Sequence, residues 1–128
     1  MNPAPMLFLV DDDPAIRASL TFSLELEGFA VRTFDSAEAL IGRGEQAAPS
    51  CLLLDYRLPG LDGLSLLQQL RGKGQNCPAI LITSNPPRRV RQRAREAGAT
   101  LVEKPLLGNR LTAAIRALIA AAPTVSAA

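Results

Sequence analysis

The chain has 128 residues, of which 48% are hydrophobic and 20% charged, and this is the size and composition of a single folded domain. It contains no histidine, which excludes Ser-His-Asp triads, Cys-His pairs and histidine-ligated metal sites. Its 14 basic and 12 acidic residues give a net charge of +2, so we expect no strong attraction of the whole chain to nucleic acid or to a membrane.

Short apolar runs predict five strands, which in chain order are Met6–Val10, Ala30–Phe34, 52–54, 79–82 and 100–102. The first, third and fourth runs are apolar almost throughout, and strands of that kind are covered on both faces. We therefore expect these three strands at the centre of a parallel sheet, with the other two beside them.

Helical stretches alternate with these strands, at 14–27, 36–43, about 64–72, 88–97 and 109–122. In the first of them Asp13 is a candidate N-cap, Pro14 takes the first helical position, and Gly28 ends the helix. Five alternations of strand and helix predict an α/β fold: a five-stranded parallel sheet, doubly wound, with helices on both faces. Residues 1–5 are expected to be an N-terminal extension, 6–121 the domain, and 122–128 a tail or the start of a linker.

The two cysteines, Cys51 and Cys77, are far apart and form no CxxC motif, so we expect buried free thiols in a reducing compartment. No apolar run reaches the ~20 residues of a membrane span, and the first residues lack a basic signal segment. The expected location is the cytoplasm, without membrane contact.

Polar side chains follow each central strand at the point where it ends. Asp11, Asp12 and Asp13 follow the first strand, Asp55 follows the third, and Thr83 and Lys104 follow the last two. In open α/β sheets the functional groups lie just past the carboxyl ends of the strands. We therefore expect these side chains to meet in one pocket.

The predicted pocket holds three carboxylates, those of Asp11, Asp12 and Asp55. Two like charges ~4 Å apart repel by ~4 kcal/mol at an effective dielectric of ~20, so such a cluster either raises a carboxyl pKa or binds a cation. A small set of oxygen ligands favours Mg²⁺ over Zn²⁺ or Ca²⁺. The alternative is that the aspartates after the first strand only cap the first helix, as we expect of Asp13.

A carboxylate beside a bound metal can accept a phosphoryl group, and Asp55 is the candidate. The Thr83 hydroxyl and the Lys104 ammonium suit phosphoryl oxygens. Each residue also has an ordinary structural interpretation. Asp55 could start a turn, Thr83 could simply end a strand, and Lys104 could be a solvated lysine at a strand end. Their convergence on one edge favours the functional interpretation. Gly60 and Gly63 are expected in tight turns before the third helix.

Together these motifs resemble the receiver domain of two-component response regulators, most of all the nitrogen-fixation regulator subfamily. The similar segments are Leu-Val-Asp-Asp-Asp at 9–13, 54–63, Ile-Thr-Ser at 82–84 and Glu-Lys-Pro at 103–105, within 6–121. The resemblance implies a flavodoxin-like (βα)₅ fold and a phosphorylation-dependent switch that regulates transcription through an output domain or partner.

The resemblance also implies residue roles. Asp55 accepts a phosphoryl group from a sensor histidine kinase. Mg²⁺ is held by Asp12, Asp55 and the backbone carbonyl of Arg57, with Asp11 acting through water. The only chemistry implied is self-directed phosphotransfer and autodephosphorylation, without enzymatic turnover.

Two further residues complete that set. Lys104, before a cis peptide bond to Pro105, pairs with the phosphoryl group. Thr83 moves towards that group and shifts the face formed by the fourth helix, the fifth strand and the fifth helix.

Two departures from the family pattern lie between Ala99 and Lys104, a segment that is one residue shorter than is common. Leu101 also occupies the position of the usual aromatic residue, so the usual coupling of the threonine to that aromatic is in question. A receiver-like module that acts by contact without switching therefore stays open. A small phosphatase would need an aspartate in place of Arg57, and a flavodoxin-like cofactor binder would need a glycine-rich loop in place of the three aspartates.

Five arginines fall in the predicted fourth helix, namely Arg88, Arg89, Arg91, Arg93 and Arg95. Val90, Ala94 and Ala97 form its narrow apolar stripe, so we expect it to pack weakly. The cluster is either a solvated basic face or a surface for an output domain, a second receiver or the kinase. Direct nucleic-acid contact is not expected, because no aromatic residues are interleaved.

Overall fold

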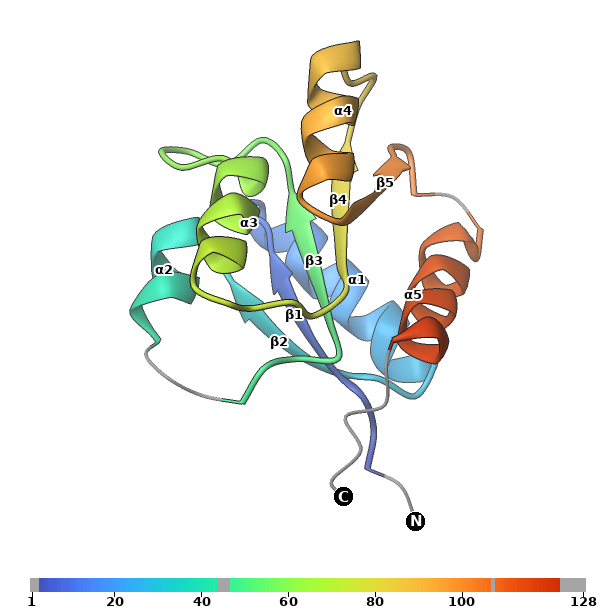
Figure 1. Cartoon of the computed structure of the whole chain (residues 1–128). Helices are drawn as coiled ribbons and strands as arrows, with labels where there is room; N and C mark the ends of the chain where they lie inside the picture. Colours follow the sequence, from blue (N-terminus) through green and yellow to red (C-terminus); the bar gives the residue numbers. More distant parts are fainter. Residues whose placement is uncertain (1–2, 44–46, 107, 123–128) are drawn as a thin grey trace.

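Five parallel strands form one sheet in the computed structural model, which describes residues 3–43, 47–106 and 108–122 (Figure 1). The strands are β1 (Met6–Val10), β2 (Ala30–Phe34), β3 (Cys51–Asp55), β4 (Ala79–Thr83) and β5 (Ala99–Glu103). Their spatial order is β2-β1-β3-β4-β5, with every neighbouring pair parallel. The three apolar runs predicted to be central are the three inner strands.

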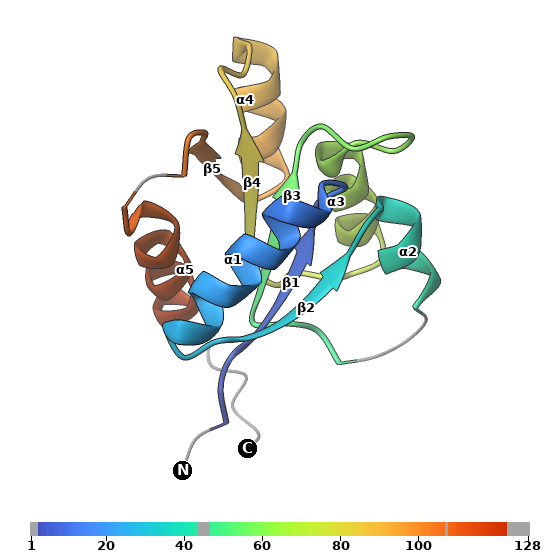
Figure 2. The same ribbon diagram turned by 180° about the vertical axis from the view of Figure 1, so that it is seen from behind.

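Helices cover both faces of the sheet, as predicted. They are α1 (Pro14–Leu26), α2 (Ala37–Gly42), α3 (Gly63–Gly72), α4 (Arg88–Glu96) and α5 (Arg110–Ala121). The two opposite views show α1 and α5 on one face and α2, α3 and α4 on the other (Figures 1 and 2). The doubly wound α/β fold is confirmed.

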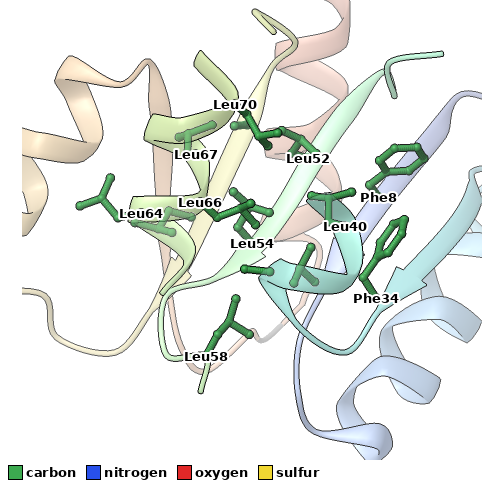
Figure 3. Close-up of a cluster of buried hydrophobic side chains, with 14 of the residues drawn as sticks. Phe8, Phe34, Leu40, Leu52, Leu54, Leu58, Leu64, Leu66, Leu67 and Leu70 are labelled. Atoms are coloured by element: carbon green, nitrogen blue, oxygen red, sulfur yellow. The ribbon is translucent and has the colours of Figure 1, made fainter. Parts of the chain in front are cut away.

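The strands separate two hydrophobic cores, because successive side chains point to opposite faces. On β1, Leu7 and Leu9 pack with α1 and α5, whereas Phe8 and Val10 pack with α2 and α3. Figure 3 shows the second of these cores, in which leucines of α3 lie over β3 and Phe34 lies beside Phe8. The inner strands are thus apolar on both faces, which fixes β3 and its terminal aspartate firmly in the sheet.

Local sequence sets most helix boundaries. Asp13 accepts hydrogen bonds from the backbone N–H groups of Ala15 and Ile16, at 2.9 and 3.4 Å, and so caps α1. Ser36 caps α2 through the N–H group of Ala39 at 3.0 Å. Residues 1–2 and 123–128 lie outside the described residues, so the proposed extension and tail at the two ends stay predictions.

Both cysteines are free thiols, as predicted, although only Cys51 is fully buried. Burial raises the pKa of Cys51 to about 12 and also raises the pKa of Cys77. Among the residues described, none of the helices has the length and apolar character that a membrane span requires.

Candidate functional site

Three polar side chains are buried at the carboxyl edge of the sheet, and they are those of Asp11, Asp55 and Thr83. Their residues are 3%, 5% and 3% exposed, respectively. Asp11 directly follows β1, whereas Asp55 and Thr83 are the last residues of β3 and β4. Burying a carboxylate costs free energy unless a partner offsets the loss of water, so two of them at one edge indicate a site.

Asp12 joins the two buried aspartates. One carboxylate oxygen each of Asp11, Asp12 and Asp55 lies within 4.8 Å of the others. Burial raises the pKa of Asp11, and the negative charge of Asp55 shifts this pKa in the same direction. Asp12 is exposed, so solvent reaches this cluster. Three carboxylate oxygens this close together suit a hard divalent cation.

Backbone contacts hold the aspartates in place. The N–H group of Asp13 donates to Asp11 Oδ1 at 2.9 Å, and Arg17 Nη1 donates to the backbone carbonyl of Asp11 at 2.7 Å. The N–H group of Arg57 donates to Asp55 Oδ1 at 3.2 Å. Helix capping falls to Asp13, so the capping alternative accounts for Asp13 and not for the carboxylates of Asp11 and Asp12.

Lys104 reaches the pocket from β5. Its ammonium nitrogen lies 3.4 Å from Asp55 Oδ1, and its backbone N–H group donates to the carbonyl of Thr83 at 2.8 Å. The peptide bond between Lys104 and Pro105 is cis, as predicted. The strand ends of β3, β4 and β5 therefore place a carboxylate, a hydroxyl and a cation at one edge.

Gly63 is a site-building residue that sequence reasoning missed. It begins α3 instead of lying in a turn, and a Cβ atom at this position would collide with the backbone carbonyl oxygen of Asp55. Gly60, with φ +75°, does fit the expected turn. The available signal was a glycine at a first helical position, directly after the N-cap Asp62, where glycine is a poor helix former.

Leu101 lies on the face of β5 that packs against α4. It is half-buried and contacts the core cluster that contains Val90 and Ala94 of α4. Its register partner Leu81 lies two residues before Thr83 on the neighbouring strand. An aliphatic side chain therefore packs against the core beside α4, on the strand next to that of Thr83.

A parallel sheet with an acidic pocket, a hydroxyl and a lysine at its carboxyl edge is the arrangement of a phosphorylation-dependent signalling domain. The chain belongs to the response regulator receiver domain family, which matches residues 7–116. Receiver domains generally bind Mg²⁺ at an acidic pocket, and the aspartate cluster is a pocket of that kind. Receiver domains of transcriptional regulators are generally not enzymes.

Among the relatives, FixJ agrees with the subfamily predicted from the motifs. The transcriptional regulatory protein FixJ of Bradyrhizobium diazoefficiens is 35% identical over 114 residues, which cover 88% of this chain and 56% of FixJ. The C4-dicarboxylate transport regulator DctD of Rhizobium meliloti is 36% identical over 118 residues, 91% of this chain and 25% of DctD. The chain thus spans about half of FixJ and a quarter of DctD.

The fold is also shared with a solved structure. The crystal structure of FixJ-N has a TM-score of 0.83 and 32% identity, and the match covers 95% of this chain and 98% of that one.

Proposed function

We propose that Asp55 is the phosphoacceptor, and that it receives its phosphoryl group from a phosphohistidine of a sensor histidine kinase. The observation that supports this most is its position: a buried carboxylate at the end of β3, close to two other carboxylates and 3.4 Å from the ammonium of Lys104. In the transfer, an Asp55 oxygen forms a bond to phosphorus while the bond from phosphorus to the histidine nitrogen breaks. The negative charge on the phosphoryl oxygens has to be offset, which is the main requirement of phosphoryl transfer.

The pocket's own residues meet that requirement. Asp12, Asp55 and the backbone carbonyl of Arg57 would hold Mg²⁺, and Asp11 would support the ion through a water molecule. When bound, the metal ion neutralises charge on the phosphoryl oxygens and orients them. Arg57 suits this role because its own N–H group already bonds to Asp55 and fixes the loop beside the pocket.

Lys104 and Thr83 act on the phosphoryl group itself. The lysine ammonium pairs with one phosphoryl oxygen, and the threonine hydroxyl donates a hydrogen bond to another. Movement of Thr83 towards the group changes the packing beside Leu101 and α4, and so shifts the face formed by α4, β5 and α5. The half-buried aliphatic Leu101 also supports a second candidate, a receiver-like module that binds its partner without this shift.

The chain itself turns over no substrate in this proposal, apart from its own phosphotransfer and autodephosphorylation. The names of FixJ and DctD support a role in transcription, exerted through an output domain or a partner. Two free thiols and a kinase partner favour the cytoplasm as the place of the reaction.

The test uses a small-molecule phosphodonor, such as acetyl phosphate, with Mg²⁺, followed by intact mass. The wild-type chain is expected to gain one phosphoryl group, and Asp55→Ala is expected to gain none. Asp13→Asn is the matched control, since asparagine caps a helix as well as aspartate does. Uptake by Asp55→Ala at the wild-type rate contradicts the assignment.

The metal ligands are tested separately. Asp12→Ala removes one carboxylate and is expected to weaken Mg²⁺ binding, measured by titration calorimetry with Asp13→Asn as the control. Unchanged Mg²⁺ affinity in Asp12→Ala contradicts its role as a ligand.

A further inference from the structure

A hollow of about 540 Å³ lies between α2 and α3, away from the aspartates. Leu52, in its lining, precedes Asp55 on β3 by three residues, which is about 10 Å along a strand. Helix α3 starts beside Asp55, and Leu70 and Lys73, which also line the hollow, lie at its other end. The hollow is thus separate from the acidic pocket, and its volume is in the range of small-molecule sites.

The inner wall of the hollow is apolar. It includes Phe8, Leu40, Leu52 and Leu70, which are at most 8% exposed. Figure 3 labels all four side chains, which come from β1, α2, β3 and α3. Because burying apolar surface is favourable, this wall suits the apolar part of a ligand.

Two cations complete the lining, and both are the C-cap residues of their helices: Arg43 of α2 and Lys73 of α3. The guanidinium carbon of Arg43 lies 4.7 Å from the centroid of the Phe8 ring, so this charge stands directly against the apolar wall. Lys73 is exposed, and Gln75 adds a side-chain amide. Among the described residues that line the hollow, none is acidic.

A cation at a helix C-terminus also suits the helix macrodipole, and this is the ordinary explanation of Arg43 and Lys73. It accounts for each charge separately. It does not account for an apolar hollow between the two charges, in a domain whose interior is otherwise closely packed.

We propose that this hollow binds a small organic anion that has an apolar body and one carboxylate, as a medium-chain fatty acid does. The body lies on the wall formed by the leucines and Phe8. The carboxylate lies between Arg43 and Lys73, and the side-chain amide of Gln75 donates a hydrogen bond to it. A small polar anion fits less well, because it leaves the apolar wall without a partner.

The test uses the unphosphorylated chain, so its outcome is independent of the role proposed for Asp55. Octanoate is titrated into the isotope-labelled chain, below the concentration at which it forms micelles, and followed by NMR. Octanol, which has the body without the charge, and acetate, which has the charge without the body, are the control ligands. Octanoate is expected to shift the resonances of residues around the hollow and to bind more tightly than either control.

Equal affinity for octanoate and octanol overturns the proposal, and so does equal affinity for octanoate and acetate. Shifts scattered over the whole surface also overturn it, because they indicate non-specific association.

Two variants test the site itself. Lys73→Gln is expected to weaken octanoate binding about threefold, whereas Arg110→Gln, which removes the same charge at an exposed position outside the hollow, is expected to bind like wild type. Ile41→Trp enlarges a half-buried lining residue of α2 and is expected to weaken binding at least tenfold, with thermal denaturation as the check that it folds. Equal binding by Lys73→Gln and Arg110→Gln overturns the proposal, as does wild-type binding by a folded Ile41→Trp.

Discussion

The acidic pocket and helix α4 both concentrate like charge, but in opposite settings. In the pocket three carboxylates have oxygens within 4.8 Å of one another, and two of the aspartates are buried. On α4 five arginines are spread around an exposed helix. Repulsion between exposed charges is screened by salt and water, whereas repulsion between largely buried charges is screened much less. The packing of the sheet therefore has to offset the repulsion between the aspartates, whereas the repulsion between the arginines of α4 is small.

The largest effect is expected from a change to the backbone contact beneath the pocket. Gly63→Ala places a Cβ atom against the carbonyl of Asp55, so the free energy of unfolding is expected to fall by about 2–3 kcal/mol. Phosphoryl uptake is also expected to slow. Urea denaturation measures the first effect and mass spectrometry the second.

Gly72→Ala in the same helix is the control. Apart from the neighbouring backbone of its own helix, nothing lies within 4 Å of a Cβ at that position, so this variant is expected to gain about 0.5–1 kcal/mol from helix propensity. Equal stability of the two variants would show that the contact between Gly63 and Asp55 does not constrain the pocket.

A smaller effect is expected from removing one charge of the pocket. Asp11→Asn keeps the shape of the side chain and an oxygen that accepts the N–H group of Asp13, but relieves the repulsion by Asp55. Without metal, the variant is expected to be more stable than wild type by about 1 kcal/mol. Adding Mg²⁺ is expected to raise the melting temperature of wild type more than that of Asp11→Asn, as differential scanning calorimetry can measure.

Asp13→Asn changes the same charge outside the pocket and is expected to leave both quantities within error of wild type. If Asp11→Asn is less stable than wild type in the absence of metal, repulsion is not what limits the pocket.

The smallest effects are expected on α4, where charge is exposed. Arg89→Glu places an acid in the first turn and is expected to stabilise the domain by about 0.5 kcal/mol, whereas Arg95→Glu in the last turn is expected to destabilise it by a similar amount. Thermal denaturation at low salt compares the two. An effect of the same sign in both variants, or a change as large as that of Gly63→Ala, would contradict the claim that exposed charges on α4 affect stability less than the buried pocket does.

The sequence was sufficient to predict the central strands, because Met6–Val10 and the runs at 52–54 and 79–82 are apolar on both faces. It also predicted the pocket, since Asp55 and Thr83 end two of these strands. Alternation of strand and helix is compatible with more than one crossover order, so the order of the strands followed only from the flavodoxin-like fold that the resemblance implied.

The contacts that sequence reasoning missed depend on the approach of distant segments. Gly63 packs on Asp55 only because α3 starts beside the end of β3. Arg91 and Arg93 of α4 bond to Glu103 and Gln68, and these contacts depend on where β5 and α3 lie. No local pattern of charge or hydrophobicity carries that information.

The buried thiol of Cys51 lies on β3, the strand that carries Asp55, and its reactivity can report on the opening of that strand. Cys51 is 0% exposed, and its pKa of about 12, against an ordinary value of 9.0, lowers its thiolate fraction near neutral pH about a thousandfold. An alkylating reagent can therefore modify Cys51 only during the moments when β3 leaves the sheet. The rate of modification therefore rises with the population of the open state, so Cys51 reports how readily the strand that carries Asp55 opens.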